Sequence, residues 1–97
     1  MPTYARVPRF DKDFAGLTRD EQLAFRLAVA KFVEDLARRG PFRKGLRVKG
    51  VKGSTGVFEM TWSDDGRATF EYGPNQLLGE PHVIWRRVGT NAIFAKP

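Results

Sequence analysis

The sequence contains no cysteine, which excludes disulfides, thiolate metal sites and a cysteine nucleophile. It also has no apolar run approaching the roughly 18 residues of a membrane-spanning helix. The first ten residues lack the apolar stretch of a signal peptide. Because small secreted domains are usually stapled by disulfides, we expect a cytoplasmic protein with no membrane segment.

Internal repeats and low-complexity tracts are absent as well. A chain of 97 residues has the length of one domain, so residues 1–97 are expected to fold as a single unit. Eight phenylalanines favour a packed core over disorder.

Basic residues outnumber acidic ones by 17 to 11, and arginine is the commoner cation, which suits bidentate contacts with phosphate. Residues 36–58 contain seven basic side chains and no acidic one. They are Arg38, Arg39, Arg43, Lys44, Arg47, Lys49 and Lys52. This segment is a candidate surface for a polyanion. A solvated surface or a dock for an acidic protein would give the same pattern.

The N-terminal part of the chain predicts one strand and one short helix. Residues 3–9 alternate loosely and contain Pro8, which is typical of an edge strand that ends near the proline. Asp11 is a candidate N-cap of a short helix that Gly16 would limit.

A capping box formed by Thr18 and Glu21 predicts the start of a longer helix, and Gly40 with Pro41 predicts its end. Its apolar stripe consists of Phe25, Ala28, Val29, Phe32 and Leu36. Such a stripe indicates a helix that packs on a sheet.

The rest of the chain predicts strands. Residues 46–49, 57–62 and 67–72 alternate between apolar and polar side chains, and Asp64 to Gly66 is a hairpin turn. Residues 82–88 are apolar on both faces, which favours a strand inside the sheet. The predicted class is α+β, with two N-terminal helices packed on one face of a small, mainly antiparallel sheet.

Period-two alternation predicts a polar sheet face on the side away from the helix. Its members are Arg47, Lys49, Glu59, Thr61, Arg67, Thr69 and Glu71. We expect this face to be open, because no second helical layer can be identified. An open basic face suits RNA, although one polar face is also ordinary for an antiparallel sheet.

His82 is the only histidine and is therefore a candidate general acid or base. A single histidine beside a proline at the start of a strand is also a common structural residue. No set of ligands has the spacing of a metal site. We therefore expect neither a metal nor another cofactor.

The order of elements and several segments resemble the RelE/ParE superfamily of type II toxin–antitoxin toxins. The supporting segments are residues 10–14, the helix that ends in Gly40, residues 46–50 and 57–62, Gly66 with Arg67, and residues 85–90. The resemblance implies a β-α-α-β-β-β(β) fold over residues 1–97. It also implies a metal-independent endoribonuclease (an mRNA interferase) that works on the ribosome, inhibits translation and is bound by a cognate antitoxin in a hetero-oligomer.

In this resemblance Arg67 is the strongest match, since family members place an arginine there against the scissile phosphate. Lys49 and Lys52 fall where relatives hold the RNA backbone. Glu59 falls where some relatives have a catalytic lysine, and it could serve as a base. The remaining candidate RNA-binding residues are Arg43, Lys44, Arg47 and Arg87.

Asn91 occupies the position where close relatives carry a histidine and other branches an arginine. Asparagine donates hydrogen bonds but cannot carry a proton at neutral pH. Either His82 or Glu59 would then replace the missing group. The alternatives are a ParE-like inhibitor of gyrase, and a degenerate member that only binds its antitoxin or RNA.

Overall fold

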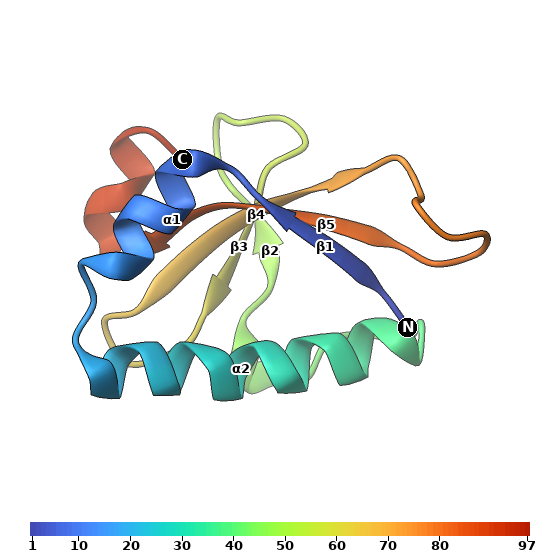
Figure 1. Cartoon of the computed structure of the whole chain (residues 1–97), viewed down its shortest axis with the longest axis horizontal. Helices are drawn as coiled ribbons and strands as arrows, with labels where there is room; N and C mark the ends of the chain where they lie inside the picture. Colours follow the sequence, from blue (N-terminus) through green and yellow to red (C-terminus); the bar gives the residue numbers. More distant parts are fainter.

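The computed structural model describes residues 1–97 as a five-stranded sheet with one long helix across one face (Figure 1). In chain order the elements are β1 (Thr3–Arg6), α1 (Pro8–Ala15), α2 (Arg19–Ala37), the 3-10 turn η1 (Lys44–Leu46), β2 (Lys49–Gly50), β3 (Phe58–Thr61), β4 (Arg67–Gly73), β5 (His82–Gly89) and the 3-10 turn η2 (Asn91–Ala95). The predicted α+β class is confirmed.

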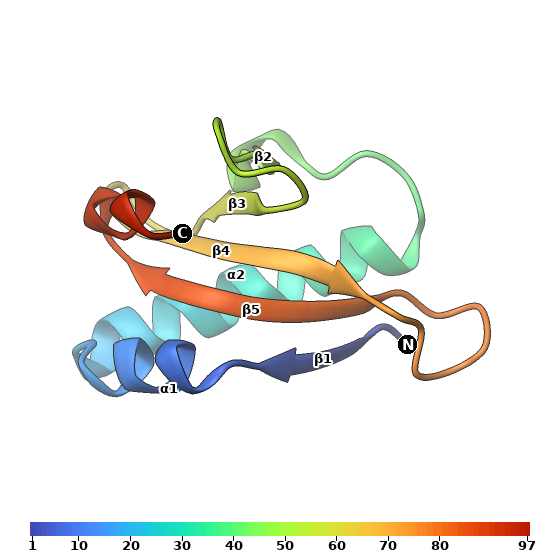
Figure 2. The ribbon, with the colours of Figure 1, turned by 90° about the horizontal axis from the view of Figure 1, so that it is seen from above.

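The strands lie in the order β1-β5-β4-β3-β2. The β1 strand pairs with β5 in parallel, and every other neighbouring pair is antiparallel. Figure 2 shows β5 between β1 and β4, as its apolar pattern predicted, with β1 at the sheet edge. None of the helices combines the length and apolar character needed to cross a membrane.

The start of α1 differs from the prediction. Pro8 is the first helical residue and Val7 the N-cap, so the predicted cap at Asp11 is wrong. The fixed φ of proline suits the first position of a helix, where its missing N–H costs nothing. Asp11 instead lies inside the first turn and pairs with Arg6 at 3.2 Å. Gly16 ends the helix, as predicted.

The capping box of α2 is confirmed by reciprocal bonds between Thr18 and Glu21. The Thr18 N–H donates to Glu21 Oε1 at 2.7 Å, and the Glu21 N–H donates to Thr18 Oγ1 at 3.2 Å. The helix ends at Ala37, three residues before the predicted stop at Gly40. Arg39 already has a left-handed backbone, with φ 58°, and so cannot continue the helix.

The core between α2 and the sheet is largely aromatic. Phe32 packs on Phe70 with ring centroids 5.0 Å apart, and Trp85 lies 5.4 Å from Phe70 and 5.5 Å from Phe25. Burying each such side chain contributes about 1.5–3 kcal/mol. The predicted helix stripe and the inward-facing strand residues therefore meet in one core.

The predicted strand at residues 46–49 is wrong. Residues 44–46 form η1, Arg47 is left-handed with φ 48°, and only Lys49 and Gly50 pair with β3. Leu46 N–H donates to Arg43 O and Arg47 N–H to Lys44 O. These local bonds use the amides that a longer strand would have paired across the sheet.

A β-bulge interrupts the pairing of β4 with β5. Thr69 is paired with Arg87 and Phe70 with Trp85, so Arg86 is an extra residue in β5. Trp85 and Val88 are both buried in the core. Because a bulge shifts the alternation by one residue, Arg86 and Arg87 both lie on the face away from α2.

Candidate nucleic-acid interface

Arg67 is the first residue of β4 and lies where three strands end together. Its Cα partners are Thr61 on β3 and Gly89 on β5. The turn that precedes it joins β3 to β4, as the sequence predicted. Arg67 therefore lies at a corner of the sheet, with its side chain only half-buried.

The Arg67 guanidinium is held by the turn itself. Its Nη1 donates to the carbonyl oxygens of Ser63 at 3.2 Å, Asp64 at 3.2 Å and Gly66 at 2.8 Å. No carboxylate pairs with it. The carbonyls fix the orientation of the side chain while leaving its positive charge uncompensated.

Gly66 makes this turn possible through its small size. A Cβ atom there would lie 2.5 Å from two ring carbons of Trp62 and 2.5 Å from Ser63 Oγ. The Trp62 ring meets Phe25 edge-on at 6.1 Å. The turn therefore packs on the aromatic core, and this packing fixes the position of Arg67.

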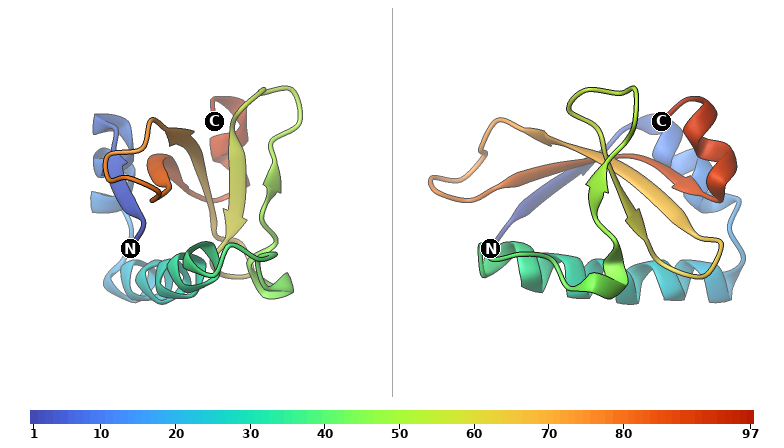
Figure 3. Two further views of the ribbon diagram at one scale, coloured as in Figure 1. Left: turned by 90° about the vertical axis from the view of Figure 1, so that its right-hand side faces the viewer. Right: turned by 180° about the vertical axis from the view of Figure 1, so that it is seen from behind.

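Arg67 lines a cleft that we call the turn cleft, formed by α2, η1 and the β3–β4 turn. The right-hand view of Figure 3 shows η1 and this turn beside the same helix. Its principal lining residues are Leu27, Lys31, Arg43, Arg47, Trp62 and Arg67. Lys31 and Arg47 form no ion pair, and Asp64 is the only acidic residue of the lining. The turn cleft is therefore strongly cationic, and the sequence did not predict that Lys31 belongs to it.

Glu59 shares the sheet face of Arg67. The Cα partners Lys49, Glu59, Thr69 and Arg87 form one row across the strands. Glu59 lies two residues before Thr61, the Cα partner of Arg67, so Glu59 and Arg67 are diagonal neighbours. The structure thus brings together the predicted cation and the predicted base.

The predicted open face is partly covered, contrary to expectation. Thr69 is fully buried, and its hydroxyl donates to the Pro97 carbonyl at 3.0 Å. Ile93 is buried as well, because η2 turns the chain back over β4 and β5 (Figure 2). The apolar side chain of Ile93 gains burial on this face, which a strand-by-strand reading could not show. Lys49, Glu59, Thr61 and Arg67 remain partly or fully exposed.

Asn91 lies at the Arg67 end of the sheet. It is the first residue of η2, exposed, and two residues beyond Gly89, the Cα partner of Arg67. Thr90 caps this turn by accepting the Ala92 N–H at 3.3 Å. Asn91 is therefore placed beside the corner that holds Arg67 and Glu59.

His82 lies at the opposite end. Its Cα partners are Gly73 and Thr3, and its Nδ1 is 2.7 Å from Thr3 Oγ1. Arg67 and Gly73 are six residues apart on β4, which corresponds to about 20 Å. The structure does not bring His82 to Arg67, and its buried hydrogen bond matches the structural alternative.

Arg43 is held by a buried carboxylate that sequence reasoning missed. Asp35 accepts from Arg43 Nε at 2.8 Å, Nη2 at 2.7 Å and the backbone N–H at 2.9 Å, and also from Arg38. The Arg43 guanidinium holds the pKa of Asp35 well below its usual range. The missed signal was spacing, since Asp35 lies three residues after Phe32 on the apolar stripe. We call Asp35, Glu34, Arg38 and Arg43 the Asp35 cluster.

The other two predicted RNA-binding lysines lie in exposed loops. Lys44 begins η1 and Lys52 lies between β2 and β3; neither forms an ion pair. No group of three or more His, Cys, Asp or Glu side chains is placed to hold a metal ion.

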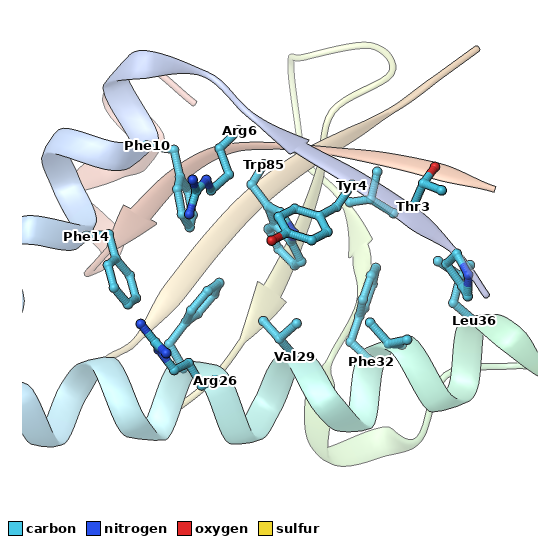
Figure 4. Close-up of a pocket in the computed structure, with 14 residues that line it drawn as sticks. Thr3, Tyr4, Arg6, Phe10, Phe14, Arg26, Val29, Phe32, Leu36 and Trp85 are labelled. Carbon is cyan, nitrogen blue, oxygen red and sulfur yellow. The ribbon is translucent and has the colours of Figure 1, made fainter. Parts of the chain in front are cut away.

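An apolar groove lies between β1, α1 and α2 and was not predicted (Figure 4). Its apolar lining includes Tyr4, Phe10, Phe14, Val29, Val33 and Leu36. Two arginines also line it: Arg6, and Arg26, whose Cζ is 5.5 Å from the centre of the Phe14 ring. Tyr4 is 66% exposed. The groove therefore combines apolar surface with positive charge.

Solved structures identify the fold, whereas sequence comparisons do not. No protein-family model and no curated protein matches the chain in sequence. A YoeB/ParE toxin from Agrobacterium tumefaciens has a TM-score of 0.65 at 12% identity, with 92% of this chain and 98% of that chain covered. The RelB–RelE antitoxin–toxin complex from Methanococcus jannaschii has a TM-score of 0.62 at 15% identity, covering 95% of both chains. The DinJ–YafQ toxin–antitoxin complex of E. coli has a TM-score of 0.60 at 15% identity, with 94% and 93% covered. The chain therefore has the RelE/ParE-like toxin fold.

Proposed function

We propose that this chain, which has the RelE/ParE-like toxin fold, is the toxin of a type II toxin–antitoxin system. We further propose that it acts on the ribosome as a metal-independent mRNA endonuclease. The supporting observation is the state of Arg67, which is oriented by three carbonyl oxygens and has no carboxylate partner. A cation that is already oriented and has no acidic partner can bind a phosphate without rearranging.

In the proposed reaction the RNA 2′-hydroxyl oxygen bonds to the adjacent phosphorus, and the bond to the 5′-oxygen of the next nucleotide breaks. The products are a 2′,3′-cyclic phosphate and a free 5′-hydroxyl. Arg67 donates to a phosphate oxygen whose negative charge increases in the transition state. One preorganised donor of this kind contributes about 3–4 kcal/mol, a factor of 10²–10³ in rate.

Proton transfer falls to Glu59 in this proposal. Its carboxylate shares the face of Arg67 and would accept the proton of the 2′-hydroxyl, and a solvent water would supply the proton that the leaving 5′-oxygen takes up. Asn91 would donate a hydrogen bond to the phosphate, because its amide cannot carry a proton. His82 is left out of the reaction, since it lies at the far end of β4 and β5.

Cations on both sides of Arg67 would hold the RNA backbone. Lys31 and Arg47 flank it in the turn cleft, and Lys49 and Lys52 lie toward the β2 edge. The remaining predicted contacts are Lys44, Arg43, which would act mainly by shaping the turn cleft, and Arg87. Contacts to phosphate give affinity without sequence preference.

The test is cleavage of mRNA on programmed ribosomes by the wild-type chain and by Arg67→Ala. We expect cutting by the wild type and a loss of 10²-fold or more in the variant. Arg19→Ala is the matched control, since it removes an exposed arginine at the start of α2.

Uncut mRNA with the wild-type chain would contradict the nuclease proposal and leave a role limited to binding. Intact mRNA together with DNA damage would point to gyrase instead. Equal cutting by Arg67→Ala would show that another residue is responsible.

An antitoxin partner is part of the proposal. Two of the similar structures are complexes with antitoxins. The apolar groove offers such a partner a surface for apolar anchors, and Arg26, which forms no ion pair, favours an acidic segment. Val33→Glu places a negative charge in the groove, and we expect it to abolish copurification with a coexpressed antitoxin. Unchanged copurification would mean that the partner binds elsewhere.

A further inference from the structure

A second cationic depression lies on the sheet face away from α2, and we call it the tail pocket. It is lined by Arg9, Ser54, Arg86, Arg87, Lys96 and Pro97, with Val7 and Val57. Four of the eight residues are cations and none is acidic. Its lining comes from four segments far apart in the sequence, namely α1 with the residue before it, the β2–β3 loop, β5 and the C-terminal tail.

The β-bulge is what brings two arginines to this pocket. Regular alternation would place consecutive residues on opposite faces of the sheet. The extra residue in β5 puts Arg86 and Arg87 on the same face. A strand without the bulge would present only one of them here.

Both arginines are fixed by a carboxylate outside the lining and by a carbonyl group of the C-terminal tail within it. Arg86 Nη1 donates to Glu71 at 3.2 Å and its Nε to the Pro97 carbonyl at 3.1 Å. Arg87 Nε donates to Asp13 at 2.6 Å and its Nη1 to the Lys96 carbonyl at 3.0 Å. The guanidinium groups are therefore ordered before any ligand arrives, which lowers the entropic cost of binding.

The pocket retains uncompensated charge. Glu71 and Asp13 offset the two arginines, whereas Arg9 and Lys96 have no carboxylate partner. The side chains of the lining therefore include two cations that no side-chain carboxylate offsets. Ser54 adds a hydroxyl that donates or accepts. Cations together with a hydroxyl donor match the oxygens of a phosphate.

We infer that the tail pocket is a second phosphate site, which binds a backbone phosphate of single-stranded RNA. Val57 of its lining immediately precedes β3 and lies four residues before Thr61, which corresponds to about 13 Å from the Arg67 corner. A strand of a few nucleotides spans that distance. An acidic protein segment is a poorer match, because protein interfaces depend on aromatic or large apolar anchors and this lining contains no aromatic residue and only two valines. The inference rests on the proposed RNA-directed function.

The first experiment measures RNA binding without cleavage. The probe is a short, fluorescein-labelled single-stranded RNA with methylated 2′-hydroxyls. Its affinity is measured by fluorescence anisotropy at a series of salt concentrations. The variant Arg9→Ala/Lys96→Ala removes the two uncompensated charges. The control Lys12→Ala/Arg19→Ala removes the same charge from exposed positions outside the pocket. All four residues are exposed, so both variants should fold.

We expect the pocket variant to bind several-fold more weakly than the control. The slope of log affinity against log salt should fall by about 0.7 for each lost phosphate contact, hence about 1.4 for two. Equal losses in the two variants would overturn the inference, because they would reflect general charge only. RNA binding by the pocket variant that equals wild-type binding would also overturn it, because Arg9 and Lys96 would then make no contact with an RNA phosphate.

A second experiment uses the wild-type chain alone. Titration with inorganic phosphate should shift the backbone amide NMR signals of Arg9, Ser54 and Lys96 more than those of Lys12 and Arg19. An absence of such shifts contradicts the site. Because neither experiment requires cleavage, a chain that binds RNA through the pocket yet leaves mRNA uncut disproves only the proposed nuclease activity.

Discussion

The Asp35 cluster and the turn cleft share Arg43 but use their arginines in opposite ways. In the cluster, Arg38 and Arg43 bind a carboxylate whose side chain has no exposed surface. In the turn cleft, Arg67 binds only neutral carbonyl groups. The first arrangement stabilises the fold by satisfying a buried charge, whereas the second leaves a charge available to a ligand.

Because of this difference, the number of basic residues in a segment does not give the number of cations that are available to a ligand. Residues 36–58 contain seven cations and no acid, which predicted a uniform polyanion surface. Two of those cations pair with acids of α2 that precede the segment in the sequence. Lys31, which precedes the segment, lines the turn cleft instead. The positive charge available to a ligand is therefore set by the absence of acidic partners and not by the local density of basic residues.

The largest expected effect is a loss of thermal stability when the Asp35 cluster is disrupted. Asp35→Asn keeps the shape of the side chain but removes the buried negative charge that Arg38 and Arg43 share, which leaves them only the exposed carboxylate of Glu34. Breaking a buried pair on one side is strongly destabilising. We expect the melting temperature to fall by roughly 15 °C or more, measured by circular dichroism.

Arg67→Ala provides the contrast, because its partners are turn carbonyls that water can reach. We expect its melting temperature to fall by about 5 °C or less. A comparable loss in both variants would erase the distinction between a structural arginine and a ligand-binding one.

The Asp35 cluster also predicts a pH dependence of stability. The hydrogen bonds from Arg43 lower the pKa of Asp35 in the folded state, so the unfolded state binds the proton more readily. The stabilisation is complete above the unfolded pKa of about 4 and is lost as the pH falls through the folded value. Wild-type stability should thus decrease in acid below about pH 4. Denaturation series at several pH values should show a shallower decrease for Asp35→Asn.

A smaller effect is expected at the turn that orients Arg67. Gly66→Ala forces a Cβ against the Trp62 ring, which lies on the core, and overpacking of this kind costs about 1–3 kcal/mol. Gly45→Ala is the matched control, since a Cβ there meets nothing within 4 Å. Urea denaturation of both variants measures the difference. Equal stability would mean that the turn adapts freely and does not fix Arg67.

Local patterns predicted several parts of this molecule correctly. The capping box of Thr18 and Glu21, the interior position of β5 and the turn before Arg67 all depend on residues close in sequence. The common face of Glu59 and Arg67 also followed from alternation, because β3 and β4 are joined by a short turn and pair in regular register. The catalytic roles of Arg67, Glu59 and Asn91 remain predictions.

Other features depended on contacts that local patterns cannot encode. Asp35 lies in the buried stripe because Arg43, eight residues later, supplies its hydrogen bonds. The polar face is partly covered because Ile93 and Pro97 fold back over Thr69. The tail pocket exists because a bulge in β5 places Arg86 and Arg87 on one face.

The sequence by itself determined the α+β class, the main helix and the wealth of cations, because propensity, capping and periodicity act over a few residues. The tertiary structure alone decided which cations are neutralised and which remain available for a ligand. The physical reason is that an ion pair requires two side chains within about 4 Å, and only the folded chain fixes which pairs meet.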